Sequence, residues 1–127
     1  MGWFGFGKKS AKIGFKNVDW LEVEGKLRQL DAMNASADQV MAKQLIIQVD
    51  VLIDSILKQG NCPGQTMGER LKSLQNIANR STLNMLWGVH KKRNELAHES
   101  GSFMAGWEKD KYYQDAKMAI SNLRGIR

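Results

Sequence analysis

The sequence predicts an all-α protein, an antiparallel helical bundle of four to five helices. Apolar residues recur at helical spacing in successive stretches of the chain, a period that indicates helices with one buried face. Each stretch also opens near a residue suited to cap a helix. Outside the first 16 residues, no segment shows the sustained alternation of a strand between turn signals. The connections are short, so we expect neighbouring helices to pack antiparallel.

The first two expected helices have recognisable starts. The first begins after Asp19, which can cap it together with Glu22. The second is long, opens at Ser36 with Gln39 three residues later, and is stopped by Gly60. The apolar stripe of the first contains Trp20, Val23, Leu27 and Leu30. The apolar face of the second contains Val40, Leu45, Ile46, Val49, Leu52, Ile53, Ile56 and Leu57.

Another face of the second helix carries Asp50 and Asp54 one turn apart, followed by Lys58. Two carboxylates at this spacing can hold Mg²⁺. A solvated surface explains the pattern more simply, especially with a lysine one turn further along. We therefore expect a wet helix face here, no metal ligand in the chain and no cofactor.

The second half of the chain predicts further helices. Thr66 opens a short one, and Ser81 or Thr82 opens the next, which runs towards Glu99. A last helix should cover residues 107–123. The large side chains expected in the core here are Trp87, Trp107 and the methionines.

The positive charge of the chain is unevenly distributed. The formal net charge is +6 over 127 residues, a length that suits one domain. Residues 1–16 hold four lysines and no acidic residue, so most of the excess lies on a glycine- and aromatic-rich N-terminal arm. Residues 17–127 form the expected helical domain and are close to neutral. Broad electrostatic capture of nucleic acid by that domain is not indicated.

The N-terminal arm admits several interpretations. Its lysines, among them Lys8, Lys9 and Lys12, can neutralise RNA phosphates while the aromatic side chains between Trp3 and Phe6 stack on bases. The same residues suit an anionic membrane surface. The aromatic side chains can also pack onto the bundle or onto a partner subunit.

The sequence places the protein in the cytoplasm. No apolar run approaches the roughly 20 residues that span a bilayer. The start of the chain lacks the apolar stretch of an export signal. The single cysteine, Cys62, excludes an internal disulfide and fits a reducing compartment. Membrane association is not expected.

The segment that carries chemistry lies near the end of the fourth stretch. Arg93 and His98 are separated by four residues, and Asn94 directly follows the arginine. The segment resembles the signature of the HEPN superfamily, which has an arginine, a polar residue that is often asparagine, and a histidine after four to six residues. The resemblance covers roughly residues 36–123. In a subset of that superfamily a tyrosine two residues after the histidine receives a nucleotide from a partner, and this chain has Ser100 there.

The resemblance implies both a fold and a function. Members of the superfamily are helical bundles that commonly pair as homodimers, and many are RNases, including toxins of toxin–antitoxin pairs and CRISPR-associated effectors. It implies that Arg93, Asn94 and His98 form a catalytic site at a dimer interface, with RNA as substrate and with an antitoxin or other protein as a further partner. We expect Lys92 to contact the RNA as well.

The chemistry of RNA cleavage suits these residue types. Attack by the 2′-hydroxyl needs a base, an acid for the departing 5′-oxygen, and positive charge on the phosphate. Histidine serves either proton role near neutral pH, and arginine holds phosphate oxygens with a planar fork of donors. Asn94 either orients the histidine or holds a phosphate oxygen. One copy supplies one such histidine, and a two-fold dimer brings two copies face to face.

Helix geometry decides whether Arg93 and His98 of one copy can reach the same place. Five residues rotate a side chain by about 140° and advance it about 7.5 Å, so Arg93 and His98 diverge unless the helix ends near Ala97.

Two other interpretations of the chain stay open. In the first, it is a non-catalytic HEPN-like dimer that binds a nucleotide, a nucleic acid or a partner protein. In the second, it is a membrane-surface adaptor that uses its arm. His90 is expected to be a packed or half-buried residue.

Overall fold

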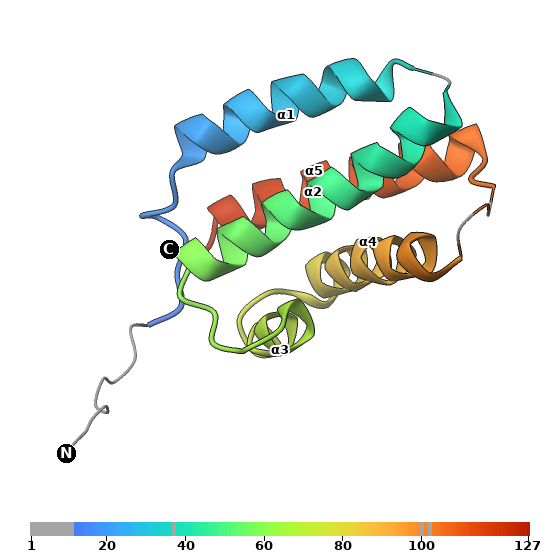
Figure 1. Cartoon of the computed structure of the whole chain (residues 1–127). Coiled ribbons are helices and arrows are strands. Elements are labelled where there is room, and N and C mark those ends of the chain that lie inside the picture. The colour runs from blue at the N-terminus through green and yellow to red at the C-terminus, as the bar shows by residue number, and fades with distance from the viewer. Residues whose placement is uncertain (1–11, 37, 100, 102) are drawn as a thin grey trace.

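The computed structural model describes residues 12–36, 38–99, 101 and 103–127, and helices occupy most of these ranges (Figure 1). No strand occurs within them, so the predicted all-α fold is confirmed. The helices are α1 (Trp20–Asn34), α2 (Gln39–Gln59), α3 (Met67–Lys72), α4 (Arg80–His98) and α5 (Gly106–Arg124). Apart from the short α3, each helix covers nearly the same residues as one of the stretches predicted from the sequence.

Helix α2 is the centre of the bundle. It packs against each of the other four helices, with α1 on one side, α4 on the opposite side and α5 behind it in the view of Figure 1. Consecutive long helices run antiparallel, as the short connections predict. The side chains that α2 contributes are fully buried at Leu45, Ile53 and Ile56. Removing this apolar surface from water is the main favourable term that holds the helices together.

Two predicted helix starts are confirmed by their caps. Asp19 Oδ1 accepts a hydrogen bond from the Glu22 N–H at 3.1 Å, at the start of α1. Thr66 Oγ1 accepts from the Glu69 N–H at 3.1 Å, at the start of α3. Each bond satisfies one of the backbone donors that a helix leaves free in its first turn.

The starts predicted for α2 and α4 are wrong by two to three residues. Asp38, and not Ser36, caps α2, since its Oδ1 accepts from the Val40 N–H at 3.0 Å. Asn79 caps α4, since its Oδ1 accepts from the Thr82 N–H at 2.8 Å. In both places several capping residues lie close together, and local sequence does not rank them.

Four residues predicted to be in the core are exposed: Val40, Trp107 and two of the methionines, Met41 at 37% and Met118 at 57% exposure. Val40 lies in the first turn of α2 with 68% of its surface exposed, and Trp107 lies in the first turn of α5 with 70% exposed. Both follow the helical period of their stretch. Each lies in the first turn of its helix, so the helical period alone does not decide whether such a position is covered.

The last residues of the predicted arm pack against the helices. Phe15 is fully buried, and its backbone N–H donates to the Ile126 carbonyl at 3.0 Å. Its ring lies where a Cβ on Gly60 would have to be, so the glycine that ends α2 also makes room for it. Residues from about Ile13 onward therefore belong to the bundle, and residues 1–11 of the predicted arm lie outside the described residues. Among the described helices, none is both long and apolar enough to cross a lipid bilayer.

Candidate functional site

Helix α4 presents the Arg93–His98 segment over its last two turns. Arg93 and Asn94 are half-buried, and His98 is exposed as the last helical residue, before the cap at Glu99. The helix thus ends one residue beyond Ala97, the end that would have let Arg93 and His98 converge. Because His98 is still helical, it remains rotated by about 140° and displaced by about 7.5 Å from Arg93.

The structure pairs Arg93 with Asn94 and not with His98. Arg93 Nη1 donates a hydrogen bond to Asn94 Oδ1 at 3.2 Å. In the described part of the chain, no hydrogen bond or ion pair joins Arg93 to His98, and no carboxylate lies within ion-pair distance of the Arg93 guanidinium. Arg93 therefore keeps a charged fork of donors that an anion can use.

Arg93 opens into a pocket between α2, α4 and the start of α3. The pocket has a volume of about 400 Å³. Its polar walls come from Asp50 and Asp54 on α2 and from His90 on α4, one turn before Arg93. Residues three apart lie on one face of a helix, which is why His90 and Arg93 reach the same pocket. The remaining lining residues are Val51, Thr66, Met67 and Gly68.

Asp50 and His90 form a buried pair at the base of this pocket. His90 Nδ1 lies 3.0 Å from Asp50 Oδ2, and Asp50 is only 3% exposed. The second carboxylate oxygen, Oδ1, is buried without a hydrogen-bond partner. Burial raises the pKa of Asp50, while the hydrogen bond to His90 and the positive charge of Arg93 oppose that rise. The prediction of a wet face is therefore wrong for Asp50.

Asp54 is held by an arginine from α3. Arg70 Nε and Nη2 donate to the two carboxylate oxygens of Asp54 at 2.7 and 2.9 Å, and Arg70 Nη1 donates to the Gly64 carbonyl at 2.8 Å. This two-pronged pair is the geometry in which arginine binds a carboxylate most strongly. It neutralises Asp54 and anchors the loop before α3 to the pocket.

Sequence reasoning missed this cluster because it judged each residue alone. His90 was expected to be packed or half-buried, and its side chain is indeed only 14% exposed. It packs against the carboxylate of Asp50. The available signal was the i, i+3 spacing of His90 and Arg93 on α4, together with the i, i+4 spacing of Asp50 and Asp54 on α2.

The lysines predicted to bind RNA differ in their surroundings. Lys92 Nζ lies 3.2 Å from Glu95 Oε1 and 3.4 Å from Glu108 Oε2, and its side chain is 11% exposed. A phosphate at Lys92 would have to compete with these two carboxylates. Lys12 is exposed. Lys8 and Lys9 lie outside the described residues, and RNA contact by all four lysines stays a prediction.

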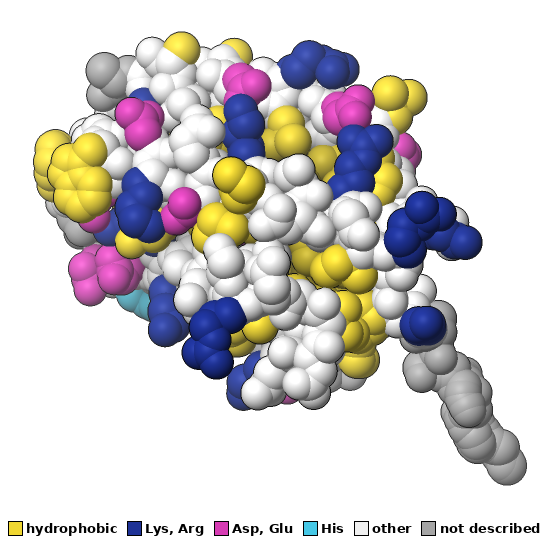
Figure 2. Space-filling view, turned by 180° about the vertical axis from the view of Figure 1, so that it is seen from behind, with side chains coloured by type: hydrophobic (Ala, Val, Ile, Leu, Met, Phe, Trp, Pro, Cys, Tyr) yellow, Lys and Arg dark blue, Asp and Glu magenta, His cyan; other side chains and the backbone are white. Residues whose placement is uncertain are grey.

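The surface charge agrees with a body that is close to neutral. Figure 2 shows Lys and Arg side chains spread over one face of the molecule, with Asp and Glu among them, rather than gathered into one patch. In the ranges that the structure describes, no three His, Cys, Asp or Glu side chains are grouped so that they could hold a metal ion. The metal independence of any reaction here stays a prediction.

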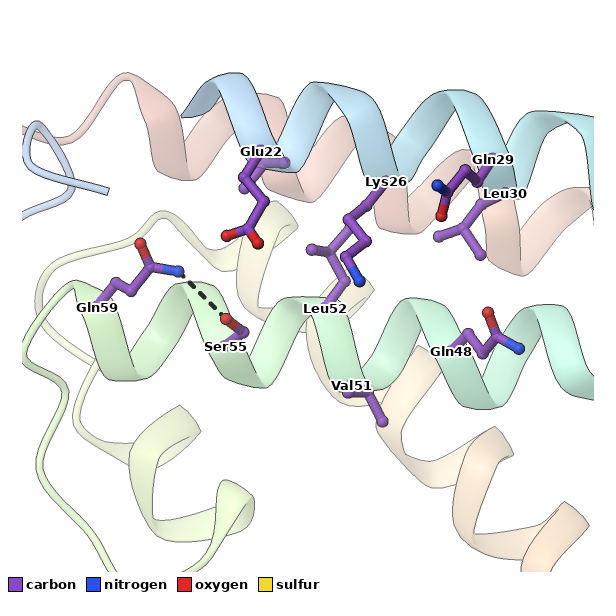
Figure 3. A pocket seen from close by; sticks show the side chains of 10 residues that line it. Glu22, Lys26, Gln29, Leu30, Gln48, Val51, Leu52, Ser55 and Gln59 are labelled. Atoms are coloured by element: carbon purple, nitrogen blue, oxygen red, sulfur yellow. Dashed lines mark hydrogen bonds between the residues drawn. The ribbon is translucent and has the colours of Figure 1, made fainter. Parts of the chain in front are cut away.

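A second hollow lies away from the motif, between α1 and α2. It has a volume of about 390 Å³. Figure 3 shows Glu22 and Lys26 of α1 facing Ser55 and Gln59 of α2 across it, with Gln59 Nε2 donating to Ser55 Oγ at 3.1 Å. The polar lining groups are amides, a hydroxyl and one charge of each sign, and the other lining residues are apolar. Nothing in this arrangement supplies a proton-transfer group with a fixed orientation.

No protein-family model, no curated protein and no solved structure matches this chain.

Proposed function

We propose that this protein is a metal-independent endoribonuclease of HEPN type, in which Arg93, Asn94 and His98 of two copies act together at a dimer interface. The setting that we propose is cytoplasmic, with a role as a toxin or in defence and with RNA as substrate. An antitoxin or another protein is a further proposed partner.

The observation that supports the proposal is that Arg93 and His98, at the end of α4, are both accessible to a ligand. Arg93 has a guanidinium that the described carboxylates leave free, and His98 is exposed at the helix end. The two side chains point in different directions on one helix. Two copies related by a two-fold axis can nonetheless bring both residue types to one phosphate, because an isologous interface contains every residue twice.

The roles follow from the chemistry. The 2′-oxygen of a ribose attacks the adjacent phosphorus, its proton passes to a base, and the bond from phosphorus to the 5′-oxygen breaks as that oxygen takes a proton from an acid. Histidine suits either proton transfer near neutral pH. Arg93 stabilises the negative charge that builds up on the phosphoryl oxygens.

Incubation of the purified full chain with mixed RNA tests the proposal. We expect cleavage by the wild type and none by Arg93→Ala or His98→Ala, with little loss of stability in either because neither side chain is in the core. Arg80→Ala is the matched control, since it removes an exposed arginine from the other end of α4. RNA binding without cleavage would favour a non-catalytic dimer. Equal loss of activity in Arg80→Ala would show that charge, and not the motif, matters.

A further inference from the structure

The pocket beside Arg93 contains a second histidine with a fixed orientation. His90 Nδ1 faces Asp50 Oδ2 at 3.0 Å. An ionised carboxylate only accepts hydrogen bonds, so it holds the imidazole in the tautomer with the proton on Nδ1. The free electron pair then lies on Nε2. In the described part of the chain Nε2 has no hydrogen-bond partner, and unlike Asp50 Oδ1 it is not a buried, unpartnered atom.

From this geometry we propose that His90, oriented by Asp50, is the base that takes the proton from the ribose 2′-hydroxyl, in a pocket where Arg93 of the same copy binds the phosphate. The inference rests on the proposed ribonuclease function and assigns its second proton-transfer group. His90 is a catalytic residue in this scheme, and Asp50 is a positioning residue that acts through it.

The burial of Asp50 favours a role beyond packing. Moving a carboxylate out of water costs several kcal/mol, and replacing a buried ion pair with well-packed apolar residues is often neutral or stabilising. Asp50 is buried with one oxygen left unpartnered, so the pair is a poor device for stability. A carboxylate behind an imidazole that lines an open pocket is, in contrast, an arrangement that makes a histidine an oriented base.

The charges that face His90 fit the reaction. Asp50 and Asp54 approach from α2, Arg70 from α3, and Arg93 from the same face of α4. Asp54 is paired with Arg70, and its Oδ2 also lies 3.7 Å from Lys58 Nζ. Asp50 opposes the charge of Arg93, so the carboxylates beside His90 each face a cation. When His90 accepts the proton, the pocket gains one positive charge at the moment when negative charge builds up on the phosphate.

The complete reaction needs one acid in addition to the base His90. The hydroxyl proton passes to His90 Nε2, the 2′-oxygen bonds to phosphorus, and the bond to the 5′-oxygen breaks as that oxygen takes a proton from His98. The products are a 2′,3′-cyclic phosphate and a 5′-hydroxyl. His90 and His98 of one copy are eight residues, or about 12 Å, apart along α4. That separation is too large for both to reach one phosphate, so the acid comes from the second copy.

The test is the pH dependence of kcat/KM for cleavage of a short RNA. His90→Asn keeps an amide donor for Asp50 near the place of Nδ1 and removes Nε2. We expect kcat/KM to fall by about 10²–10⁴-fold, with loss of the decline on the acid side of the profile. Asp50→Asn, which removes the charge and keeps an acceptor for His90, should lower kcat/KM at least about tenfold. Tyr113→Phe, a destabilised variant outside the pocket, should keep the wild-type profile.

The outcomes separate this inference from the proposed function. If His98→Ala is inactive while His90→Asn and Asp50→Asn keep the wild-type rate and profile, the dyad is structural and the inference is overturned. If both pocket variants lose activity while His98→Ala keeps it, the dyad stands and the motif assignment fails. If the wild-type chain does not cleave RNA at all, both fail. Should His90→Asn not fold, Asp50→Asn decides.

Discussion

Two adjacent cations in α4, Lys92 and Arg93, differ in whether a carboxylate neutralises them. Lys92 and Arg93 are both cations in the motif segment, yet only Lys92 has carboxylate partners among the described residues. Burial lowers the pKa of Lys92, but its hydrogen bonds to Glu95 and Glu108 outweigh that effect and raise it. Lys92 therefore ties α4 to the first turn of α5, whereas Arg93 remains available to an anion.

Residue identity alone was enough to propose part of the candidate site. Arg93, Asn94 and His98 were recognisable because their spacing forms a motif, and the structure places them on the helix end that was expected. The Asp50–His90 pair joins residues 40 positions apart in the chain. Such a contact follows from how α2 and α4 pack, and no local pattern encodes it.

Tyr113 allows a prediction at the scale of one hydrogen bond. Its buried hydroxyl donates to Asp31 Oδ1 at 2.6 Å, and this bond is the main reason that the pKa of Asp31 lies below its ordinary value of 3.8. A carboxyl with a lowered pKa stabilises the fold above its ordinary pKa and loses that contribution as the pH falls through the lowered value. Tyr113→Phe should therefore cost about 1 kcal/mol near neutral pH, and less in acid.

Urea unfolding at about pH 7 and about pH 2.5 measures this difference. Tyr112→Phe is the matched control, because the Tyr112 hydroxyl makes no hydrogen bond within the described residues and should change stability little. A loss in Tyr113→Phe that is equal at both pH values would show that the Asp31 bond is not its cause.

Among the elements, the periods of the helices were easier to predict than their ends. Apolar spacing located every long helix because a buried stripe must repeat with the turn of the helix. The starts of α2 and α4 were less certain because capping depends on which of several polar side chains reaches a free N–H. At α2, Ser36 Oγ accepts from the Asp38 N–H, and Asp38 is the residue that caps the helix.

The cap of α4 is directly testable. Asn79→Ala removes the oxygen that accepts from the Thr82 N–H, so we expect a loss of about 1 kcal/mol in the free energy of unfolding. Ser81→Ala, at an exposed position in the first turn of the same helix, should be close to neutral. Chemical denaturation of both variants gives the comparison. A larger loss in Ser81→Ala would move the cap to the position that the sequence alone suggests.

At the scale of the whole molecule, the chain is a bundle whose charged site lies where three helices meet. Helix α2 contributes two carboxylates and α4 a histidine and an arginine to one pocket, and Arg70 of α3 binds one of these carboxylates, Asp54. The all-α fold followed from the sequence because periodicity, capping and short connections all agree. The assembly of two copies does not follow from one chain, and it stays a prediction of the proposed function.

Dilution tests that assembly. Since the proposed reaction uses His98 from a second copy, activity per subunit should fall as the protein is diluted below the dissociation constant of the dimer. Sedimentation measured over the same concentrations gives that constant independently. Constant activity per subunit in solutions that contain only monomer would place the complete site within one chain.

The most direct test of the central claim is the chemistry of the cleaved ends in EDTA. In the proposed reaction Arg93, His90 and His98 provide charge and proton transfer without a metal, and both oxygens of Asp54 are already bonded to Arg70. The wild-type chain should therefore cut RNA in EDTA and leave a 2′,3′-cyclic phosphate and a 5′-hydroxyl, because the 2′-oxygen attacks. Cleavage that stops in EDTA and returns with Mg²⁺ would contradict this account and would make Asp50 and Asp54 the first residues to test.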